Sequence, residues 1–338
     1  MHENVTIIGD GQMGLVLADA LIYRGVEVRL WGPFPENLDE LRQSRRSGRL
    51  PGFDLAPDVR CEPCEDAALA GATLVVNAIP TQFIRRVWCR LAPHLPEGIP
   101  IVSVSKGIEN ETLALPSRIL IESIGQNDPQ KAHDEVVLSG PTIARELAER
   151  RPATMVAAAQ DPALAERVQE LFNVPWLRVY GSDDPLGVEV AGATKNVIAL
   201  AAGMVDGLEA GDNAKSALLA RGLAEIARLG AALGAKVDTF FGIAGVGDLA
   251  TTCFSPLGRN RTCGERLGRG ESLDEILGDS LSVIEGVPTT QSVHQLSQQF
   301  GVDMPIAHAV NEILFGDLAP REAIQRLMSR ELKPERIG

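Results

Sequence analysis

One lysine stands out in an otherwise uncharged stretch of the chain. Lys195 is the only ionisable residue between Glu189 and Asp206, and its neighbours are apolar, small or neutral, a pattern that predicts a buried helix. A buried ammonium group loses hydration, so it needs a carboxylate partner or a lowered pKa. A lysine tuned in this way can transfer protons near neutral pH. The competing interpretation is a lysine that extends from a helix start to water.

A carboxylate and several cations follow Lys195 in the sequence. The glycine-rich turn "GIAGVGD" ends at Asp248, and its glycines are expected at positions of backbone contact or positive φ. The segment "GRNR" then supplies Arg259, Asn260 and Arg261. Arginine matches phosphate geometry with a rigid fork of donors. In a chain of net charge -13, a local cluster of lysine and arginine predicts a focused anion site.

A second motif lies near the N-terminus. The hexapeptide "GDGQMG", with its glycines at Gly9, Gly11 and Gly14, follows the apolar run Val5 to Ile8 and precedes a helical pattern from Leu15 to Tyr23. Glycines in a strand-to-helix turn let the backbone approach a pyrophosphate, and the helix N-terminus favours its charge. This context predicts a dinucleotide-binding site.

The residues after the next strand leave the choice of dinucleotide open. An acid at the end of "EVRLW" (27–31) would bind a ribose 2′-hydroxyl and select NAD. The chain has Gly32-Pro33-Phe34 there, with neither an acid nor an arginine. Four arginines follow between Arg42 and Arg49, and they predict either a solvated helix face or a contact to the ribose.

Two more segments place polar residues after buried strands. Lys106 follows the strand in "SVSKGIE", and Gly140-Pro141-Thr142 link the strand in "LSGPTIARE" to a helix. Ligands of open α/β sheets bind outside the carboxyl ends of the strands. Lys106 is therefore a candidate ligand residue, while Thr142 is either a ligand residue or an ordinary helix cap.

These residues need a scaffold, and the strand pattern predicts one. Val- and Ile-rich strands alternate with helical patterns through the first half, which predicts a doubly wound parallel sheet covered on both faces. After "SDDP" (182–185) long helical segments replace the strands. We expect a Rossmann-like α/β domain over residues 1–184 and an all-α domain over residues 185–338. The strands are expected at Val5–Ile8, Glu27–Trp31, Thr73–Pro80, Pro100–Gly107, Glu135–Pro141, Thr154–Ala159 and Trp176–Ser182.

Composition excludes several classes of protein. The net charge of -13 over 338 residues argues against a nucleic-acid binder or a polybasic membrane contact. We expect no stretch apolar enough to span a bilayer, no signal peptide and a cytoplasmic location. The five scattered cysteines are expected as reduced thiols. The Cys61–Cys64 pair is expected in a surface loop before a helix, with a redox or zinc site as the alternative; no metal site or histidine catalyst is assigned.

The motifs together resemble the NAD(P)-dependent glycerol-3-phosphate dehydrogenases over nearly the whole chain. The matching pieces are "GDGQMG", "LWG", "SVSKGIE", "LSGPTIARE", "ATKNVIALAAGMVDGLEAGDNAKSALLARG", "AGVGDLATTC", "GRNR" and "VIEGV". The resemblance implies reversible hydride transfer between NAD or NADP and C2 of dihydroxyacetone phosphate or sn-glycerol 3-phosphate. It also implies that the product supplies phospholipid synthesis.

The resemblance also implies roles for individual residues. Lys195 is expected as the general acid/base, with Asp248 and Lys106 as further catalytic residues. Substrate contacts are expected at Lys106, Gly140, Thr142, Lys195, Asn196, Asp248, Thr252, Gly258, Arg259 and Asn260. Cofactor contacts are expected at Gly9, Gly11, Gln12, Met13, Gly14, Pro33, Lys106, Ala144, Arg259, Val283 and Glu285.

The chain departs from the family pattern at a few positions. The family often has Ser-Trp where this chain has Gln12-Met13, and Arg or His where it has Pro33. A usual serine is Gly258 here, and Thr142 replaces another.

Other interpretations of the sequence remain open. A related two-domain β-hydroxyacid dehydrogenase would need carboxylate-binding signals in place of "GVGDL…GRNR". A non-catalytic dinucleotide sensor would be favoured by the loss of Lys195 or Asp248, and both are present. A ridge of small residues beside Lys195, from Gly192 to Gly203, should let another backbone approach closely. That ridge could form a subunit contact, and we expect a homodimer.

Overall fold

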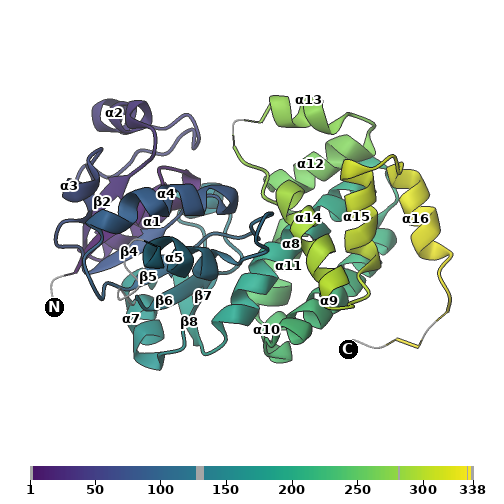
Figure 1. Ribbon diagram of the computed structural model, residues 1–338. Helices are drawn as coiled ribbons and strands as arrows, with labels where there is room; N and C mark the ends of the chain where they lie inside the picture. The colour runs from purple at the N-terminus through teal and green to yellow at the C-terminus, as the bar shows by residue number, and fades with distance from the viewer. Residues whose placement is uncertain (1–2, 127–132, 281, 333, 336–338) are drawn as a thin grey trace. The chain divides into compact units, whose positions relative to one another are not determined.

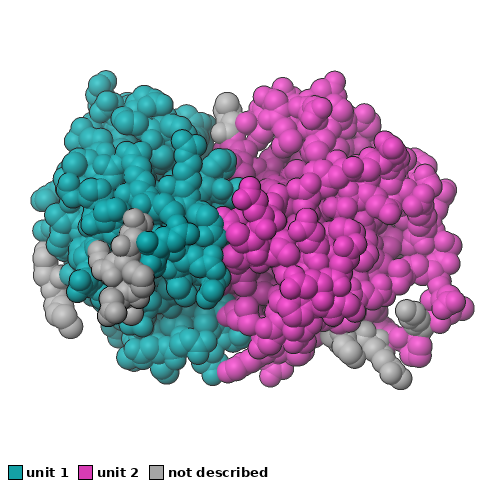
Figure 2. Space-filling view, viewed as in Figure 1, with its two compact units in different colours: residues 1–105, 116–185 teal, residues 106–115, 186–338 magenta. Residues whose placement is uncertain are grey.

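The computed structural model describes residues 3–126, 133–280, 282–332 and 334–335. Its contacts divide the chain into two compact units, coloured separately in Figure 2. Unit 1 comprises Met1–Ser105 and Pro116–Pro185, and unit 2 comprises Lys106–Leu115 and Leu186–Gly338. The expected division at residue 184 placed Lys106–Leu115 in the first domain. The structure groups this segment with unit 2, because Ile108 is buried in the helical core and its carbonyl accepts a hydrogen bond from Ser292.

All strands of the described residues lie in unit 1 and form one sheet. The sheet has eight strands in the order β3-β2-β1-β4-β5-β6-β7-β8. The seven expected strands are confirmed, and the sequence pattern missed only the two-residue β3, which contains the buried Cys61. The strands are β1 (Asn4–Ile8), β2 (Glu27–Trp31), β3 (Arg60–Cys61), β4 (Leu74–Asn77), β5 (Ile101–Ser103), β6 (Glu135–Ser139), β7 (Ala153–Ala158) and β8 (Leu177–Ser182).

One pairing corrects the expectation of a parallel sheet. Strands β6 and β7 are antiparallel, while every other pair is parallel. A parallel connection must carry the chain back along the whole strand. The helix between these strands, α6 (Ala144–Ala148), has five residues and spans only ~8 Å. It therefore turns the chain at the same edge instead of crossing the sheet.

Helices cover both faces of this sheet. Val5 and Ile7 of β1 share a core cluster with Leu17 and Leu21 of α1. Thr6, which points to the other face, donates a hydrogen bond to a backbone carbonyl of α3 at 2.6 Å. Successive side chains of β1 therefore pack against helices on opposite faces of the sheet, as a doubly wound sheet requires. The remaining helices of unit 1 are α1 (Gln12–Tyr23), α2 (Pro35–Ser44), α3 (Glu65–Leu69), α4 (Ile84–Leu91), α5 (Pro116–Gly125) and α7 (Pro162–Phe172), with short 3₁₀ turns at Thr81–Phe83 and Ala92–His94.

The regular elements among the described residues of unit 2 are all helical (Figure 1), and residues of α8 form much of its core cluster. Helix α8 (Pro185–Gly207) buries every residue from Gly187 to Val205, Lys195 included. The other helices are α9 (Asp212–Leu233), α10 (Val237–Phe240), α11 (Asp248–Phe254), α12 (Arg259–Gly268), α13 (Leu273–Gly278), α14 (Gly286–Gln299), α15 (Pro305–Phe315) and α16 (Pro320–Met328), with a π-helical turn at Ile243–Gly247.

The ridge of small residues on α8 brings another backbone into close contact, as expected. A Cβ atom added at Gly203 would lie 1.9 Å from the carbonyl oxygen of Arg261, and one added at Gly264 would lie 1.9 Å from that of Leu200. Helices α8 and α12 therefore pack through glycines on both sides. At Gly203 the ridge is thus covered by this chain's own α12 and not by a second subunit.

Helix α8 also corrects the expectation that no segment could span a bilayer. By length and composition, α8 is long and apolar enough to cross a membrane. The bent pair Val237–Phe254 and Arg259–Gly268 meets the same criterion only if the two segments are counted as one span. The most apolar window of α8 is entirely buried among the protein's own residues. Its apolar composition is therefore used for packing.

Candidate functional site

The glycine-rich loop of unit 1 has the geometry of a dinucleotide-binding turn. Gly9 has a φ of 126°, and a Cβ there would lie 2.7 Å from the carbonyl oxygen of Ala78. A Cβ on Gly14 would lie 2.1 Å from the Gly9 carbonyl oxygen, whereas one on Gly11 would meet no atom within 4 Å. Gly9 and Gly14 thus serve the turn itself, and Gly11 leaves open space at the start of α1. The loop therefore fits a pyrophosphate held against the helix N-terminus.

The other predicted cofactor residues of this loop have distinct surroundings. Met13 packs against the core of the sheet, while Gln12 donates a hydrogen bond to the backbone carbonyl of Arg49. Pro33 lies in the short connection between β2 and α2. Asp10 was not predicted as a site residue; its buried carboxylate forms an ion pair with Arg49 at 3.1 Å. Its signal was an acid between two glycines of a phosphate-binding motif.

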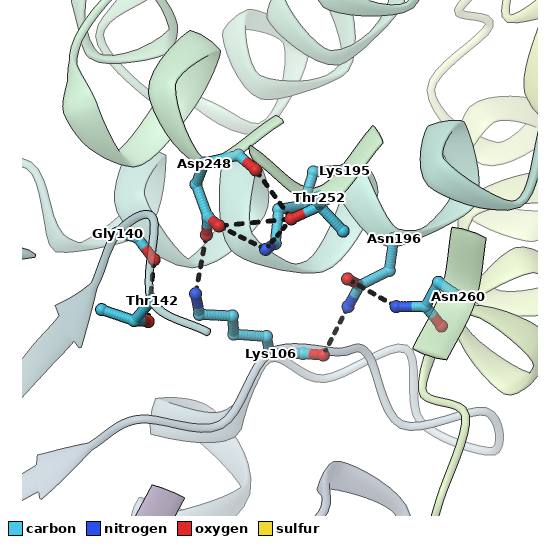
Figure 3. A network of polar contacts seen from close by, with 8 residues as sticks. All are labelled: Lys106, Gly140, Thr142, Lys195, Asn196, Asp248, Thr252 and Asn260. Carbon is cyan, nitrogen blue, oxygen red and sulfur yellow. Dashed lines mark hydrogen bonds and ion pairs between the residues drawn. The ribbon is translucent and has the colours of Figure 1, made fainter. Parts of the chain in front are cut away.

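In unit 2 the structure brings Lys195 and Lys106 together on one carboxylate, as Figure 3 shows. Lys195 Nζ lies 2.5 Å from Asp248 Oδ1, and Lys106 Nζ lies 2.7 Å from Asp248 Oδ2. Lys195 also donates a hydrogen bond to Thr252 Oγ1 at 2.6 Å. Asp248 and Thr252 are four residues apart on α11, which places both on one face of that helix. The sequence-predicted partner of the buried lysine is thus the observed one.

Burial and charge set the protonation of this group. Burial lowers the pKa of Lys195 to about 8, although the Asp248 carboxylate acts in the opposite direction and the Lys106 charge adds to the decrease. Burial alone would raise the pKa of Asp248, but Lys106 and Lys195 outweigh it and hold that pKa below its usual value. Burial raises the pKa of the neighbouring Cys253 to about 12, so its thiol stays protonated.

The glycine-rich turn before Asp248 differs in part from the expectation. Gly242 and Gly247 have φ values of -87° and -63°, and Gly245 is not among the glycines with positive φ, so the positive-φ interpretation is wrong. The backbone-contact interpretation is confirmed at Gly245, where a Cβ would lie 2.1 Å from the Phe240 carbonyl oxygen. The turn is π-helical and leads directly into α11, which begins at Asp248.

A chain of amide hydrogen bonds runs beside the lysine pair (Figure 3). Asn196 Nδ2 donates to the Lys106 carbonyl at 3.1 Å, and Asn260 Nδ2 donates to Asn196 Oδ1 at 2.9 Å. Asn260 Oδ1 in turn accepts from the backbone N–H of Gly286 at 2.9 Å. The chain links the Lys106 backbone to the first residue of α14, so Asn196 and Asn260 position Lys106 through its backbone.

Arg259 lies at the start of α12 with an exposed side chain. Its Nη1 donates a hydrogen bond to the Val283 carbonyl at 2.9 Å. Val283 lies two residues before Glu285, the N-cap of α14. Gly258 precedes it as the N-cap of α12, and a Cβ there would lie 3.2 Å from the Thr252 carbonyl oxygen. Arg259 and Gly258 are therefore next to the lysine-bearing group within unit 2.

The predicted residues after β6 belong to unit 1. Gly140 has a φ of 156°, and a Cβ there would lie 2.6 Å from the Thr154 carbonyl oxygen, so the turn requires glycine. Thr142 Oγ1 donates to the Gly140 carbonyl at 3.0 Å (Figure 3). The helix begins at Ala144 with Ile143 as its N-cap, so the interpretation of Thr142 as a helix cap is wrong.

Among the described residues, no three His, Cys, Asp or Glu side chains are grouped so that they could hold a metal ion. Cys61 and Cys64 are free thiols, and Cys64 is the exposed N-cap residue of α3. What unit 2 does offer is a buried ammonium group with a pKa near neutrality, a second lysine on the same carboxylate and an exposed arginine nearby. This arrangement can exchange a proton with a bound anion.

Comparison with known protein families agrees with this geometry. Residues 4–165 match the N-terminal model of NAD-dependent glycerol-3-phosphate dehydrogenase, and residues 184–325 match the C-terminal model. The chain is 44% identical over 338 residues to glycerol-3-phosphate dehydrogenase [NAD(P)+] of Geobacter sp. (strain M21), which covers 100% of both chains. It is 45% identical to that of Geobacillus kaustophilus, covering 98% of this chain and 96% of the relative.

A solved structure gives the same result. The crystal structure of glycerol-3-phosphate dehydrogenase from Coxiella burnetii matches with a TM-score of 0.92 and 32% identity, over 97% of this chain and 99% of that one. Two family models that together match most of the chain, and relatives of this identity over the full length, leave one assignment. The chain belongs to the NAD-dependent glycerol-3-phosphate dehydrogenase family.

Proposed function

We propose that the protein catalyses the reversible NAD(P)-dependent interconversion of dihydroxyacetone phosphate and sn-glycerol 3-phosphate. The observation that carries this proposal is the buried Lys195, paired with Asp248 and with a pKa of about 8. The glycine loop of unit 1 supports a bound dinucleotide, which supplies or accepts the hydride at C2. Residues of unit 2 then have to transfer the proton and stabilise the charge on the C2 oxygen.

Lys195 is the group we assign to the proton. In the direction of reduction, negative charge builds on the C2 oxygen, and the Lys195 ammonium stabilises it and donates its proton. In the direction of oxidation, neutral Lys195 accepts the hydroxyl proton. A pKa of about 8 supports both directions, because both forms of the amine are populated near neutral pH. Asp248 positions the amine, and Thr252 fixes its direction by a second hydrogen bond.

Arg259 is the residue we assign to the substrate phosphate. Its side chain is exposed, and its hydrogen bond to the Val283 carbonyl uses Nη1. A guanidinium has five N–H donors, so it can bind a phosphate while keeping that contact. The matched family position is shared between substrate and cofactor, so Arg259 can serve both.

We further propose that NADPH is accepted as well as NADH. The connection after β2 carries Pro33 and no acid that would repel a 2′-phosphate. Pro33→Asp adds a like charge beside that phosphate, so it should shift the ratio of specificity constants toward NADH. Steady-state kinetics with both cofactors measures this ratio, and an unchanged ratio would mean that the ribose is recognised elsewhere.

The activity test is direct. Purified protein, reduced cofactor and dihydroxyacetone phosphate should lose absorbance at the nicotinamide band. No consumption with either NADH or NADPH would contradict the proposal and favour a dinucleotide sensor. Consumption only with a β-keto acid would favour the related β-hydroxyacid dehydrogenases.

The cellular role and assembly are part of the same proposal. We propose a cytoplasmic homodimer whose product supplies phospholipid synthesis. Large apolar side chains exposed on unit 2, such as Phe254 and Leu257, are consistent with a subunit contact. Sedimentation velocity of the purified protein would show a single species of twice the chain mass, and a monomer at all concentrations would contradict the homodimer.

A further inference from the structure

We propose that Arg49 recognises the 2′-phosphate of NADPH and that Asp10 and Gln12 hold it in place for this purpose. The proposal rests on the dinucleotide binding in the proposed function and names the residue that would set its cofactor specificity. Arg49 lies in a turn beyond α2, 16 residues after Pro33, so the position in the sequence alone does not connect it with the ribose.

Asp10 brings Arg49 to the end of β2. The ribose of a dinucleotide is recognised at the carboxyl end of the second strand of such a fold. In this chain that end is Gly32, and a Cβ built on Gly32 would lie 2.8 Å from the Asp10 carboxyl carbon. The Asp10 carboxyl group thus occupies the place where a side chain at position 32 would begin. Because Arg49 Nη1 lies 3.1 Å from Asp10 Oδ2, its guanidinium lies beside this carboxyl group, next to the end of β2.

The exposure of the two partners decides which one can meet a ligand. The Asp10 side chain is 4% exposed, whereas the Arg49 side chain is 33% exposed. A buried carboxylate that already pairs with a cation is poorly placed to accept a ribose hydroxyl. The Asp10 contact engages Nη1 of a group with five donors, and a guanidinium matches phosphate oxygens with two parallel hydrogen bonds. The accessible group is therefore a cation suited to a phosphate.

The backbone of Arg49 is fixed as well. Gln12, from the first turn of α1, donates a hydrogen bond to the Arg49 carbonyl, and the next residue, Leu50, is buried in the core of unit 1. Two residues of the glycine loop therefore hold the same arginine. The Asp10 carboxylate pairs with the Arg49 side chain, and the Gln12 side chain binds the Arg49 backbone carbonyl. The departures from the family at Gln12 and Pro33 fit together, since the usual Arg or His after β2 is absent and Arg49 is held from the loop instead.

The neighbouring arginines are committed to other contacts. Arg42 donates to the Cys61 carbonyl, and Arg45 donates to the carbonyls of Val59 and Pro57. Arg46 pairs with the exposed Asp54 at 2.6 Å. Of the four arginines between positions 42 and 49, Arg49 is the one whose described ion pair reaches the glycine loop. Arg46 is therefore a matched control, with equal charge and nearly the same place in the chain.

The test measures binding without turnover. NADPH and NADH are titrated separately into the full-length wild type, Arg49→Met and Arg46→Met, with nicotinamide fluorescence as the readout. Losing a charge-assisted pair of hydrogen bonds should raise the NADPH Kd of Arg49→Met about 10- to 100-fold and change the NADH Kd less than about 3-fold. Arg46→Met should leave both values near wild type. Calorimetry with adenosine 2′,5′-bisphosphate and adenosine 5′-monophosphate should reproduce the contrast.

Several results would overturn the assignment. Equal weakening of both dinucleotides would make Arg49 a support of the loop, and unchanged NADPH binding would mean that the phosphate is recognised elsewhere. Should Arg49→Met not fold by circular dichroism, Arg49→Gln, which can still bond to Asp10, takes its place with the same expected contrast. A wild type that binds neither dinucleotide would refute the proposed function too. A wild type that binds both dinucleotides but does not reduce dihydroxyacetone phosphate would refute the proposed function and leave the Arg49 assignment standing.

Discussion

Asp248 and Glu225 are the two most deeply buried carboxylates among the described residues of unit 2, and they lie in two regions with different surroundings. Asp248, at the start of α11, receives the ammonium groups of Lys106 and Lys195. Glu225, on α9, instead accepts the backbone N–H groups of Ile306 and Ala307 at 2.8 and 3.1 Å, at the start of α15. Both residues are about 1% exposed.

The pKa values of the two groups move in opposite directions. Burial raises the pKa of Glu225 to about 7, and the two N–H groups offset only part of the effect. The two lysines hold the pKa of Asp248 below its usual value despite equal burial. Full charges close by thus keep one carboxylate ionised, while backbone dipoles leave the other easily protonated. The first organises a proton-transferring lysine, and the second joins α9 to the start of α15.

The largest effect is expected when the proton donor of the first region is removed. Lys195→Ala should lower kcat about 10²- to 10⁴-fold, which corresponds to roughly 3–5 kcal/mol of barrier, because general acid catalysis is lost. Dinucleotide affinity, measured by fluorescence quenching, should stay near wild type, since the glycine loop belongs to unit 1. Near wild-type turnover would make Lys195 a structural lysine and assign the proton to Lys106 or to a water held by Asp248.

The second prediction removes the carboxylate and keeps both lysines. The Asp248 charge raises the pKa of Lys195, so Asp248→Asn should lower that pKa below about 8. The reduction needs protonated Lys195, and its rate should fall above about pH 8 in the wild type and at lower pH in the variant. Above the pKa, the protonated fraction of the amine falls about tenfold for each further pH unit, so the two profiles should separate clearly.

The pH dependence of kcat for ketone reduction measures this difference. Glu225→Gln is the matched control, because it neutralises an equally buried carboxylate of the same unit and should leave the profile unchanged. An alkaline limb at the same pH in Asp248→Asn would show that the two groups are not coupled in the working enzyme.

A third, smaller effect separates binding from proton transfer. Arg259→Ala should raise the KM for dihydroxyacetone phosphate about tenfold or more, because a charge-assisted hydrogen bond to the phosphate is lost. It should change kcat less than Lys195→Ala does, although cofactor binding can weaken with it. Initial-rate kinetics with varied substrate decides, and a loss confined to kcat would place Arg259 outside the phosphate site.

Much of the first region could be predicted from the sequence because its signals are local. An ammonium group in an apolar helix demands a carboxylate, and a glycine-rich turn marks Asp248 as the one available. The strands were equally accessible, since continuous Val and Ile runs bounded by glycine and proline predict a parallel sheet.

The parts that could not be predicted depend on pairing between distant residues. Nothing local shows that β7 runs antiparallel to β6, because the five-residue length of α6 only becomes evident in the structure. Arg49 meets Asp10 across 39 positions, and Glu225 meets Ile306 across 81. Glu225 itself had no signal, since a glutamate in a helix is usually solvated. Pairings of this kind are set by how elements pack, not by the composition of either segment.

The smallest expected effect concerns the second region and is one of stability. The raised pKa of Glu225 means that the folded protein binds this proton more tightly than the unfolded chain does, between about pH 4.5 and 7. The free energy of unfolding should therefore fall as pH rises through this window, by up to about 3 kcal/mol for a group this deeply buried. Glu225→Gln removes the titration, so its stability should vary less between pH 5 and 7, while one N–H of α15 loses its acceptor at a cost of about 1 kcal/mol. Urea unfolding at pH 5, 6 and 7 measures both effects, with the exposed Glu166→Gln as control. A variant that keeps the wild-type slope would show that Glu225 is already ionised across this range, and the contrast with Asp248 would then lie in their partners and not in their charge.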